Sequence, residues 1–144
     1  MPNGFLTRNP TSQDISELAE LMLDAYKGTV DYDGEGMPES VKEVKSYFER
    51  ADSVAMLEQS FVAVAGNRLA AACLMSKWEK REEPLIAYIM TRASFKGRGL
   101  ASALTSLMLE SLRDSGRPGV TAFVTDGNTP SEKLLSRLGF KRLG

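Results

Sequence analysis

A short glycine loop lies between an apolar stretch and a periodic helical stretch, and this order constrains the fold more than any other feature. The apolar stretch is Leu85–Thr91, the loop is Lys96–Ala101, and apolar residues recur at helical spacing from Leu100 onward. A strand, a glycine turn and a helix start bring unpaired backbone N–H groups and the positive end of a helix dipole together. The glycines leave the backbone free to curl around an anion. The sequence therefore predicts a site for a pyrophosphate-bearing cofactor.

Other interpretations of the loop can be compared with this one. Many glycine-rich turns before helices only cap the helix, and that alternative applies here. A P-loop needs a Lys-Ser or Lys-Thr pair after its second glycine, and none follows Gly99. The pattern Gly97-x-Gly99-x-x-Ser102 approaches the dinucleotide fingerprint, which belongs on the first strand of a larger parallel sheet. Because the loop stands two-thirds of the way along the chain, nicotinamide binding is not expected.

Length and composition indicate one domain spanning residues 1–144. A chain of 144 residues is long enough to bury its own core, and 42% of it is hydrophobic. The net charge of −1 gives no reason to expect nucleic acid or membrane partners. We see no signal peptide and no apolar run long enough to cross a bilayer. The single cysteine, Cys73, cannot form an internal disulfide, which favours a cytoplasmic location.

The chain contains no histidine. This removes the commonest general base and the commonest metal ligand. With one cysteine and no histidine, a zinc site or any other metal site is not expected, and a Ser-His-Asp or Cys-His hydrolase is excluded. Any catalysis must use carboxylates, tyrosines, backbone donors or water.

The hydrophobic pattern predicts an α/β fold with a mixed, mostly antiparallel central sheet flanked by helices. A cap at 11–14 precedes the first helix, a Gly66-Asn67 turn joins two strands as a hairpin, and Gly116 stops the third helix. The expected strands cover 4–8, 61–65, 68–75, 85–91, 120–124 and 140–143, and the expected helices cover 15–26, 38–48, 100–112 and 130–138.

This arrangement resembles the GNAT superfamily of acetyl-CoA-dependent N-acetyltransferases, and the 25–35 segment resembles uncharacterised bacterial members. The family loop is Arg/Gln-x-x-Gly-x-Gly/Ala, and Lys96–Ala101 matches it with lysine at the first position. A second family signature is Asn-x-x-Ala-x-x-Leu-Tyr-x-x-x-Gly-Phe. The chain matches its register with Asn128, Ser131, Leu134, Leu135, Gly139 and Phe140.

The resemblance implies how acetyl-CoA would be held as co-substrate. Backbone amides of the loop would bind the pyrophosphate, the strand ending at Thr91 would splay from the strand at 120–124 to admit the pantetheine arm, and the Thr91 amide would face the thioester carbonyl. The alternatives to these cofactor contacts are that the side chains of Arg92 and Arg98 are solvated and that Asn128 caps the last helix. The implied cofactor contacts are Ile89, Met90, Thr91, Lys96, Gly97, Arg98, Gly99, Leu100, Ala101, Ser102, Asn128 and Ser131.

One family feature is missing. The tyrosine that usually protonates the leaving thiolate is replaced by Leu135. A general acid contributes about 10²- to 10⁴-fold, whereas orientation can supply roughly 7–11 kcal/mol, so its loss weakens catalysis without abolishing it. Tyr88 is one substitute, with packing in the strand as its alternative role. Glu79, Glu82 and Glu83 are candidate bases acting through water.

The resemblance places the acceptor beside the segment between the first two helices. That segment carries Asp31, Asp33, Glu35 and Glu39, which would attract a cationic small-molecule or peptide amine, unless the loop is merely solvated.

Two functions remain open: an N-acetyltransferase that uses direct amine attack in a ternary complex, and a non-catalytic acyl-CoA-binding sensor or interaction domain. The chain ends soon after Phe140, where relatives often continue into another strand. Either the sequence is short or a partner completes the sheet, and a homodimer is the partner arrangement that we consider.

Overall fold

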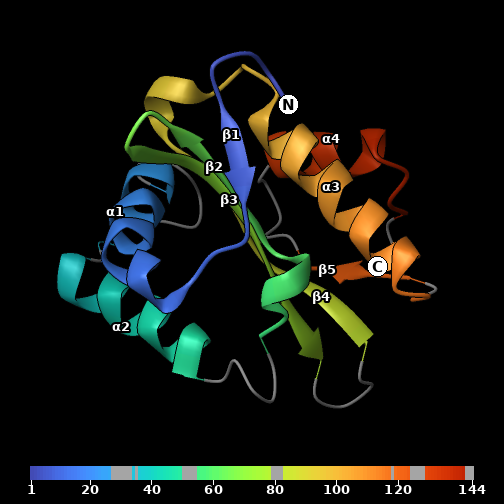
Figure 1. The fold of residues 1–144 in the computed structure, drawn as a ribbon, viewed down its shortest axis with the longest axis horizontal. Helices are drawn as coiled ribbons and strands as arrows, with labels where there is room; N and C mark the ends of the chain where they lie inside the picture. Colours follow the sequence, from blue (N-terminus) through green and yellow to red (C-terminus); the bar gives the residue numbers. More distant parts are fainter. Residues whose placement is uncertain are drawn as a thin grey trace.

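The sheet has five strands and separates two layers of helices (Figure 1). The computed structural model describes residues 1–26, 34, 36–49, 55–78, 83–117, 119–123 and 129–141. The strands lie in chain order, the first three pairings are antiparallel, and β4 and β5 are parallel. Their bounds are β1 Leu6–Arg8, β2 Phe61–Ala65, β3 Arg68–Trp78, β4 Glu83–Thr91 and β5 Thr121–Ala122.

The helices cover opposite faces of the sheet (Figure 1). One face is covered by α1 (Ile15–Tyr26) and α2 (Met37–Glu49), and the other by α3 (Leu100–Asp114) and α4 (Thr129–Arg137). Short 3-10 turns lie at Ser12–Asp14, Leu57–Gln59 and Ala93–Phe95. No helix within the described ranges is both long enough and apolar enough to cross a bilayer.

Each layer has its own apolar core. Between α1, α2 and the sheet, Leu18, Leu21 and Val44 are almost completely buried. Between α3 and the opposite face, Leu104 and Met108 are fully buried. Apolar side chains alternate between the two cores along the central strands, which is the period-two pattern expected of a sheet covered on both faces.

A capping box begins the 3-10 turn at Ser12–Asp14, which leads directly into α1. The Thr11 hydroxyl accepts from the Gln13 N–H at 3.3 Å, and the Asp14 carboxylate accepts from the Thr11 N–H at 2.8 Å. Arg8, at the end of β1, donates one hydrogen bond from each of its terminal nitrogens to that carboxylate, both at 2.8 Å. This bidentate pair joins the first strand to the first helix.

A β-bulge interrupts β4 at Ala87. On one side of the bulge Leu74 is opposite Tyr88, and on the other Met75 is opposite Ile86. Ala87 is the extra residue, so Ala87 and Tyr88 both pack toward the α1–α2 layer, whereas Ile86 and Ile89 pack toward α3. The bulge therefore aims the Tyr88 side chain at the α2 face of the sheet.

The structure confirms the predicted fold class, the capped first helix, the hairpin and the end of α3 before Gly116. Some of the predicted strand boundaries were wrong. The first strand begins at Leu6 because Gly4 has a φ of +90° and Phe5 turns into the core, and β4 already begins at Glu83. The strand expected at 120–124 covers Thr121–Ala122, with 124 outside the described residues. In the strand expected at 140–143, residues 140 and 141 are not in a strand, and the rest lies outside the described residues.

Candidate functional site

The second half of β4 presents backbone N–H groups at the sheet edge that faces away from β3. The Arg92 N–H donates to the Ala70 carbonyl at 2.8 Å, and Thr91 and Ile89 lie opposite Ala71 and Cys73. Residues of an antiparallel ladder alternate between hydrogen-bonded and non-hydrogen-bonded pairs, so the Thr91 and Ile89 amides point away from β3. Within the described residues β5 pairs with β4 only at Leu85 and Ile86. This leaves two aligned donors beyond the paired segment.

The glycine loop follows this edge directly. Gly97 and Gly99 have φ values of +82° and +79°, and Gly99 is the N-cap residue of α3. A Cβ on either glycine would meet no protein atom within 4 Å, so the backbone conformation, and not crowding by the protein, is what favours glycine here. The loop is open on its outer side, which leaves room for a ligand.

The first turn of α3 is suited to an anion. Its earliest N–H with an intrahelical acceptor is that of Ala103, which donates to the Gly99 carbonyl at 3.0 Å. The N–H groups of Leu100, Ala101 and Ser102 precede it and have no intrahelical acceptor. No side chain caps them and no acidic residue lies in the first turn. Donors and dipole both favour a pyrophosphate at this position.

The basic side chains near the loop have partners within the protein. Lys96 Nζ donates to the Ala25 carbonyl at the end of α1 at 3.3 Å. The Arg98 guanidinium lies 5.3 Å from the centre of the Phe95 ring. Arg92 is buried, and its Nε donates to the Leu69 carbonyl at 3.0 Å. The Arg92 side chain therefore has a structural role, and the backbone of the loop remains the stronger candidate for phosphate binding.

The segment expected on the far side of the cofactor is only partly described. Asn128 lies outside the described residues, and Ser131 lies half-buried in α4. Leu135 is buried in the apolar core beneath α4, together with Leu104 and Met108. The position where the family has a tyrosine acid is thus occupied by a core side chain.

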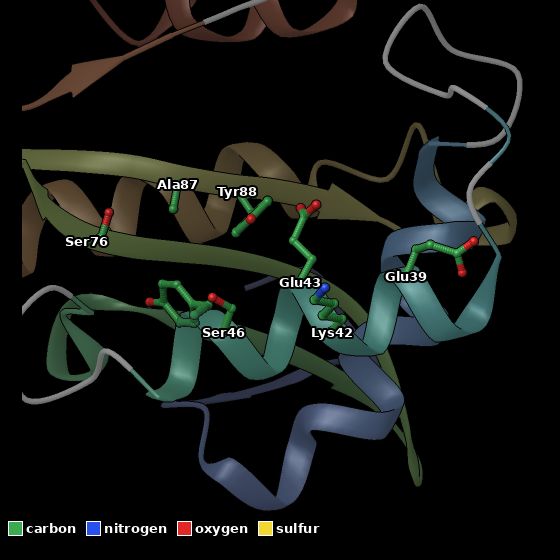
Figure 2. A pocket seen from close by; sticks show the side chains of 8 residues that line it. Glu39, Lys42, Glu43, Ser46, Ser76, Ala87 and Tyr88 are labelled. Atoms are coloured by element: carbon green, nitrogen blue, oxygen red, sulfur yellow. The ribbon is translucent and has the colours of Figure 1, made fainter.

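A pocket of about 440 Å³ opens on the other side of β4, between the sheet and α2 (Figure 2). The pocket includes Tyr88, for which the sequence allowed either a catalytic role or a packing role. Glu79, Glu82, Asp31, Asp33 and Glu35 lie outside the described residues, and Glu83 lies at the start of β4. The lining residues are Glu39, Lys42, Glu43, Ser46, Tyr47, Ser76, Ala87 and Tyr88.

Two tyrosines form the inner part of this pocket. Their rings meet edge to face with centres 6.2 Å apart. Tyr47 donates to the Met75 carbonyl at 2.5 Å, and burial raises its pKa to about 12. Burial and then the neighbouring Glu43 carboxylate raise the pKa of Tyr88 well above its usual value. Both hydroxyls therefore stay protonated near neutral pH.

The sequence did not single out most of these lining residues. Glu39, Lys42, Glu43 and Ser46 recur at helical spacing as a polar stripe beside the apolar stripe of α2. That stripe could have indicated a pocket, but charged faces of helices usually point to solvent. Ser76 lies on β3 and lines the same pocket because β3 pairs with β4. No local sequence pattern predicts this pairing.

A sequence profile of the acetyltransferase (GNAT) domain matches residues 5–141. The chain therefore belongs to the GNAT acetyltransferase family.

Individual relatives agree with this assignment. An uncharacterised N-acetyltransferase of Methanocaldococcus jannaschii is 28% identical over 145 residues, covering 95% of this chain and 61% of that protein. The chain thus spans less than two thirds of this curated relative. A crystal structure from Pyrococcus horikoshii has a TM-score of 0.81 at 21% identity, covering 97% of this chain and 90% of the other. A GNAT acetyltransferase of Brucella melitensis in complex with acetyl-CoA has a TM-score of 0.70 at 20% identity, covering 96% and 83%.

Proposed function

We propose that this protein transfers the acetyl group of acetyl-CoA to a primary amine by direct attack within a ternary complex. The observation that carries the proposal is the position of β4. Its outer edge presents the Ile89 and Thr91 amides, and its α2 face forms the floor of a pocket through Ala87 and Tyr88. A donor and an acceptor could therefore meet at one strand.

The residues of the glycine loop fit the cofactor. Backbone N–H groups from Gly97 to Ser102 would receive the pyrophosphate, because the outer side of the loop is open and the helix dipole is positive there. The Ile89 and Thr91 amides would bind the pantetheine arm and the thioester carbonyl. Asn128 and Ser131 stay our proposed contacts on the far side of the arm.

The chemistry follows from these positions. The neutral amine nitrogen attacks the thioester carbon, the C–N bond forms and the C–S bond breaks. The carbonyl oxygen gains negative charge during attack, and an oriented amide donor such as that of Thr91 stabilises it. The nitrogen loses one proton to water, and the CoA thiolate gains one. Since free thiols titrate near pH 8.5, the thiolate is a tolerable leaving group even without a dedicated acid.

A second candidate function rests on Leu135. A buried leucine cannot protonate a thiolate, so a domain that binds acyl-CoA without efficient turnover also fits this position. The two candidates share the same loop and differ in whether an amine accelerates thioester cleavage.

The test is acetyl-CoA-dependent thiol release against a panel of amines that covers polyamines, aminoglycosides, amino acids and peptides. Direct transfer predicts release that rises with amine concentration and saturates. Saturable acetyl-CoA binding with no amine-stimulated release would instead support the non-catalytic function.

A further inference from the structure

The pocket between α2 and β4 contains a carboxylate that lies beside a tyrosine side chain. Glu43 projects from α2 toward β4, and its carboxylate lies beside the end of the Tyr88 side chain (Figure 2). The proximity of this carboxylate adds to burial in raising the pKa of the Tyr88 phenol. Glu39 lies one turn earlier on the same helix face, with its carboxylate directed away from Tyr88 (Figure 2).

The Glu43 carboxylate lacks a cationic partner within the described part of the chain. The ion pair found among those residues joins Arg8 to Asp14, and Lys42 lines the same pocket without pairing to Glu43. The Tyr88 phenol is neutral and adds no positive charge. Among the described residues, the pocket thus offers a carboxylate with no cationic partner.

Glu43 is also set back from the reacting centre. A nitrogen that attacks the thioester must lie within about 3.5 Å of its carbon, which our proposal places at the β4 edge. Glu43 lies on α2, and its carboxylate lies beside the Tyr88 side chain rather than at the β4 backbone (Figure 2). The carboxylate is therefore suited to a second positive group of the acceptor rather than to the reacting nitrogen.

We propose that the acceptor is a small diamine, whose distal ammonium group is bound by Glu43 while the other amino group reaches the thioester. Tyr88 acts as a positioning residue that orients the Glu43 carboxylate. The pocket volume of about 440 Å³ suits a small molecule. This inference rests on the proposed function, because it names the substrate class of the same site.

The first experiment measures turnover of acetyl-CoA with three acceptors that share a five-carbon chain: cadaverine, aminopentanol and pentylamine. The wild-type protein should favour cadaverine in kcat/KM by roughly ten- to hundredfold, which is the usual value of a hydrogen-bonded charge pair. Glu43→Gln should abolish this preference through a rise in KM for cadaverine. Tyr88→Phe should weaken the preference less. Glu49→Gln, an exposed carboxylate on α2 outside the pocket, is the matched control.

The second experiment measures binding alone, by calorimetric titration of cadaverine into protein saturated with CoA. Cadaverine should bind to the wild type and to Glu49→Gln, and bind roughly ten- to hundredfold more weakly to Glu43→Gln. Unchanged CoA affinity of Glu43→Gln shows that the variant is folded.

The outcomes separate the two proposals. Turnover without a diamine preference, or an equal fall in kcat for all amines in Glu43→Gln, overturns the diamine site and leaves acetyl transfer intact. Glu43-dependent cadaverine binding without turnover supports the diamine site and overturns catalysis. Absence of both cadaverine binding and turnover overturns both.

Discussion

The backbone N–H of Arg92 donates to the carbonyl oxygen of Ala70 at 2.8 Å, and this bond sets the direction of the amides along the end of β4. It puts Arg92 and Met90 in hydrogen-bonded positions toward β3, and Thr91 and Ile89 in outward positions. The strand is thus anchored on one edge and offers donors on the other. The account of acetyl-CoA binding depends on this alternation.

The alternation can be tested with proline, which has no N–H to donate. Thr91→Pro removes an outward N–H that no β3 partner uses, so the protein should stay folded while kcat/KM for acetyl transfer falls by about 10²- to 10³-fold. Met90→Pro removes a bond to β3 in the sheet interior and should unfold the domain or destabilise it by about 3 kcal/mol or more. Circular dichroism and thiol release distinguish the two variants. An unfolded Thr91→Pro would contradict the assigned amide direction, and a folded variant with wild-type activity would contradict the role of this amide in acetyl transfer.

Gly99→Ala should weaken acetyl-CoA binding by at least about tenfold. Alanine at a φ of +79° costs roughly 1–2 kcal/mol, and the strained loop no longer presents its N–H groups in one direction. Gly66→Ala, at a φ of +61° in the hairpin turn, carries similar strain away from the loop. Denaturant unfolding should show similar stability losses for both variants. Acetyl-CoA titration should show a loss only for Gly99→Ala, and matching affinities would refute the role of the loop.

Leu135→Tyr tests the missing acid. Adding a phenol at this buried position should cost roughly 1–3 kcal/mol of stability. If acetyl transfer is limited by protonation of the thiolate, kcat should rise by about tenfold near neutral pH, and the gain should vanish above the thiol pKa of about 8.5. Leu134→Tyr, one residue away and equally buried, is the control for overpacking. A pH-independent gain, or the same gain in Leu134→Tyr, would exclude an acid role.

Asp14 should make the fold sensitive to acid. The Arg8 hydrogen bond holds the pKa of the Asp14 carboxyl below its usual range. Because the unfolded chain then binds the proton more readily, the contribution of Asp14 is present above about pH 4 and is lost as pH falls through the folded-state value. Asp14→Asn should lower the free energy of unfolding by about 1–2 kcal/mol at pH 7 and by less at pH 3.

Urea unfolding at the two pH values measures this effect. Asp114→Asn, which changes the same charge at the exposed end of α3, should have little effect at either pH. A loss for Asp14→Asn that does not shrink in acid would show that charge is not its source.

The sequence predicted those parts of the fold that local chemistry determines. A few neighbouring residues are enough to predict the cap at Thr11, the turn at Gly66 and the apolar stripe from Leu100. The structure contains all of these features. The glycine loop was predicted for the same reason, since its order of strand, turn and helix is contiguous.

The pocket could not be predicted in the same way. The Ala87 bulge arises from the pairing of two strands, and the stretch Leu85–Thr91 gives no local sign of it. Unless the position of the bulge is known, period-two alternation does not predict which face of the sheet the Tyr88 side chain occupies. Glu43 and Ser76 likewise meet Tyr88 only through tertiary packing of α2 and β3.

The most direct test of acetyl transfer is mass spectrometry after incubation with isotope-labelled acetyl-CoA and cadaverine. Direct attack predicts labelled N-acetylcadaverine and free CoA in equal amounts, with the mass of the protein unchanged throughout. A labelled protein that accumulates before any product, or CoA release without an acetylated amine, would contradict transfer within a ternary complex.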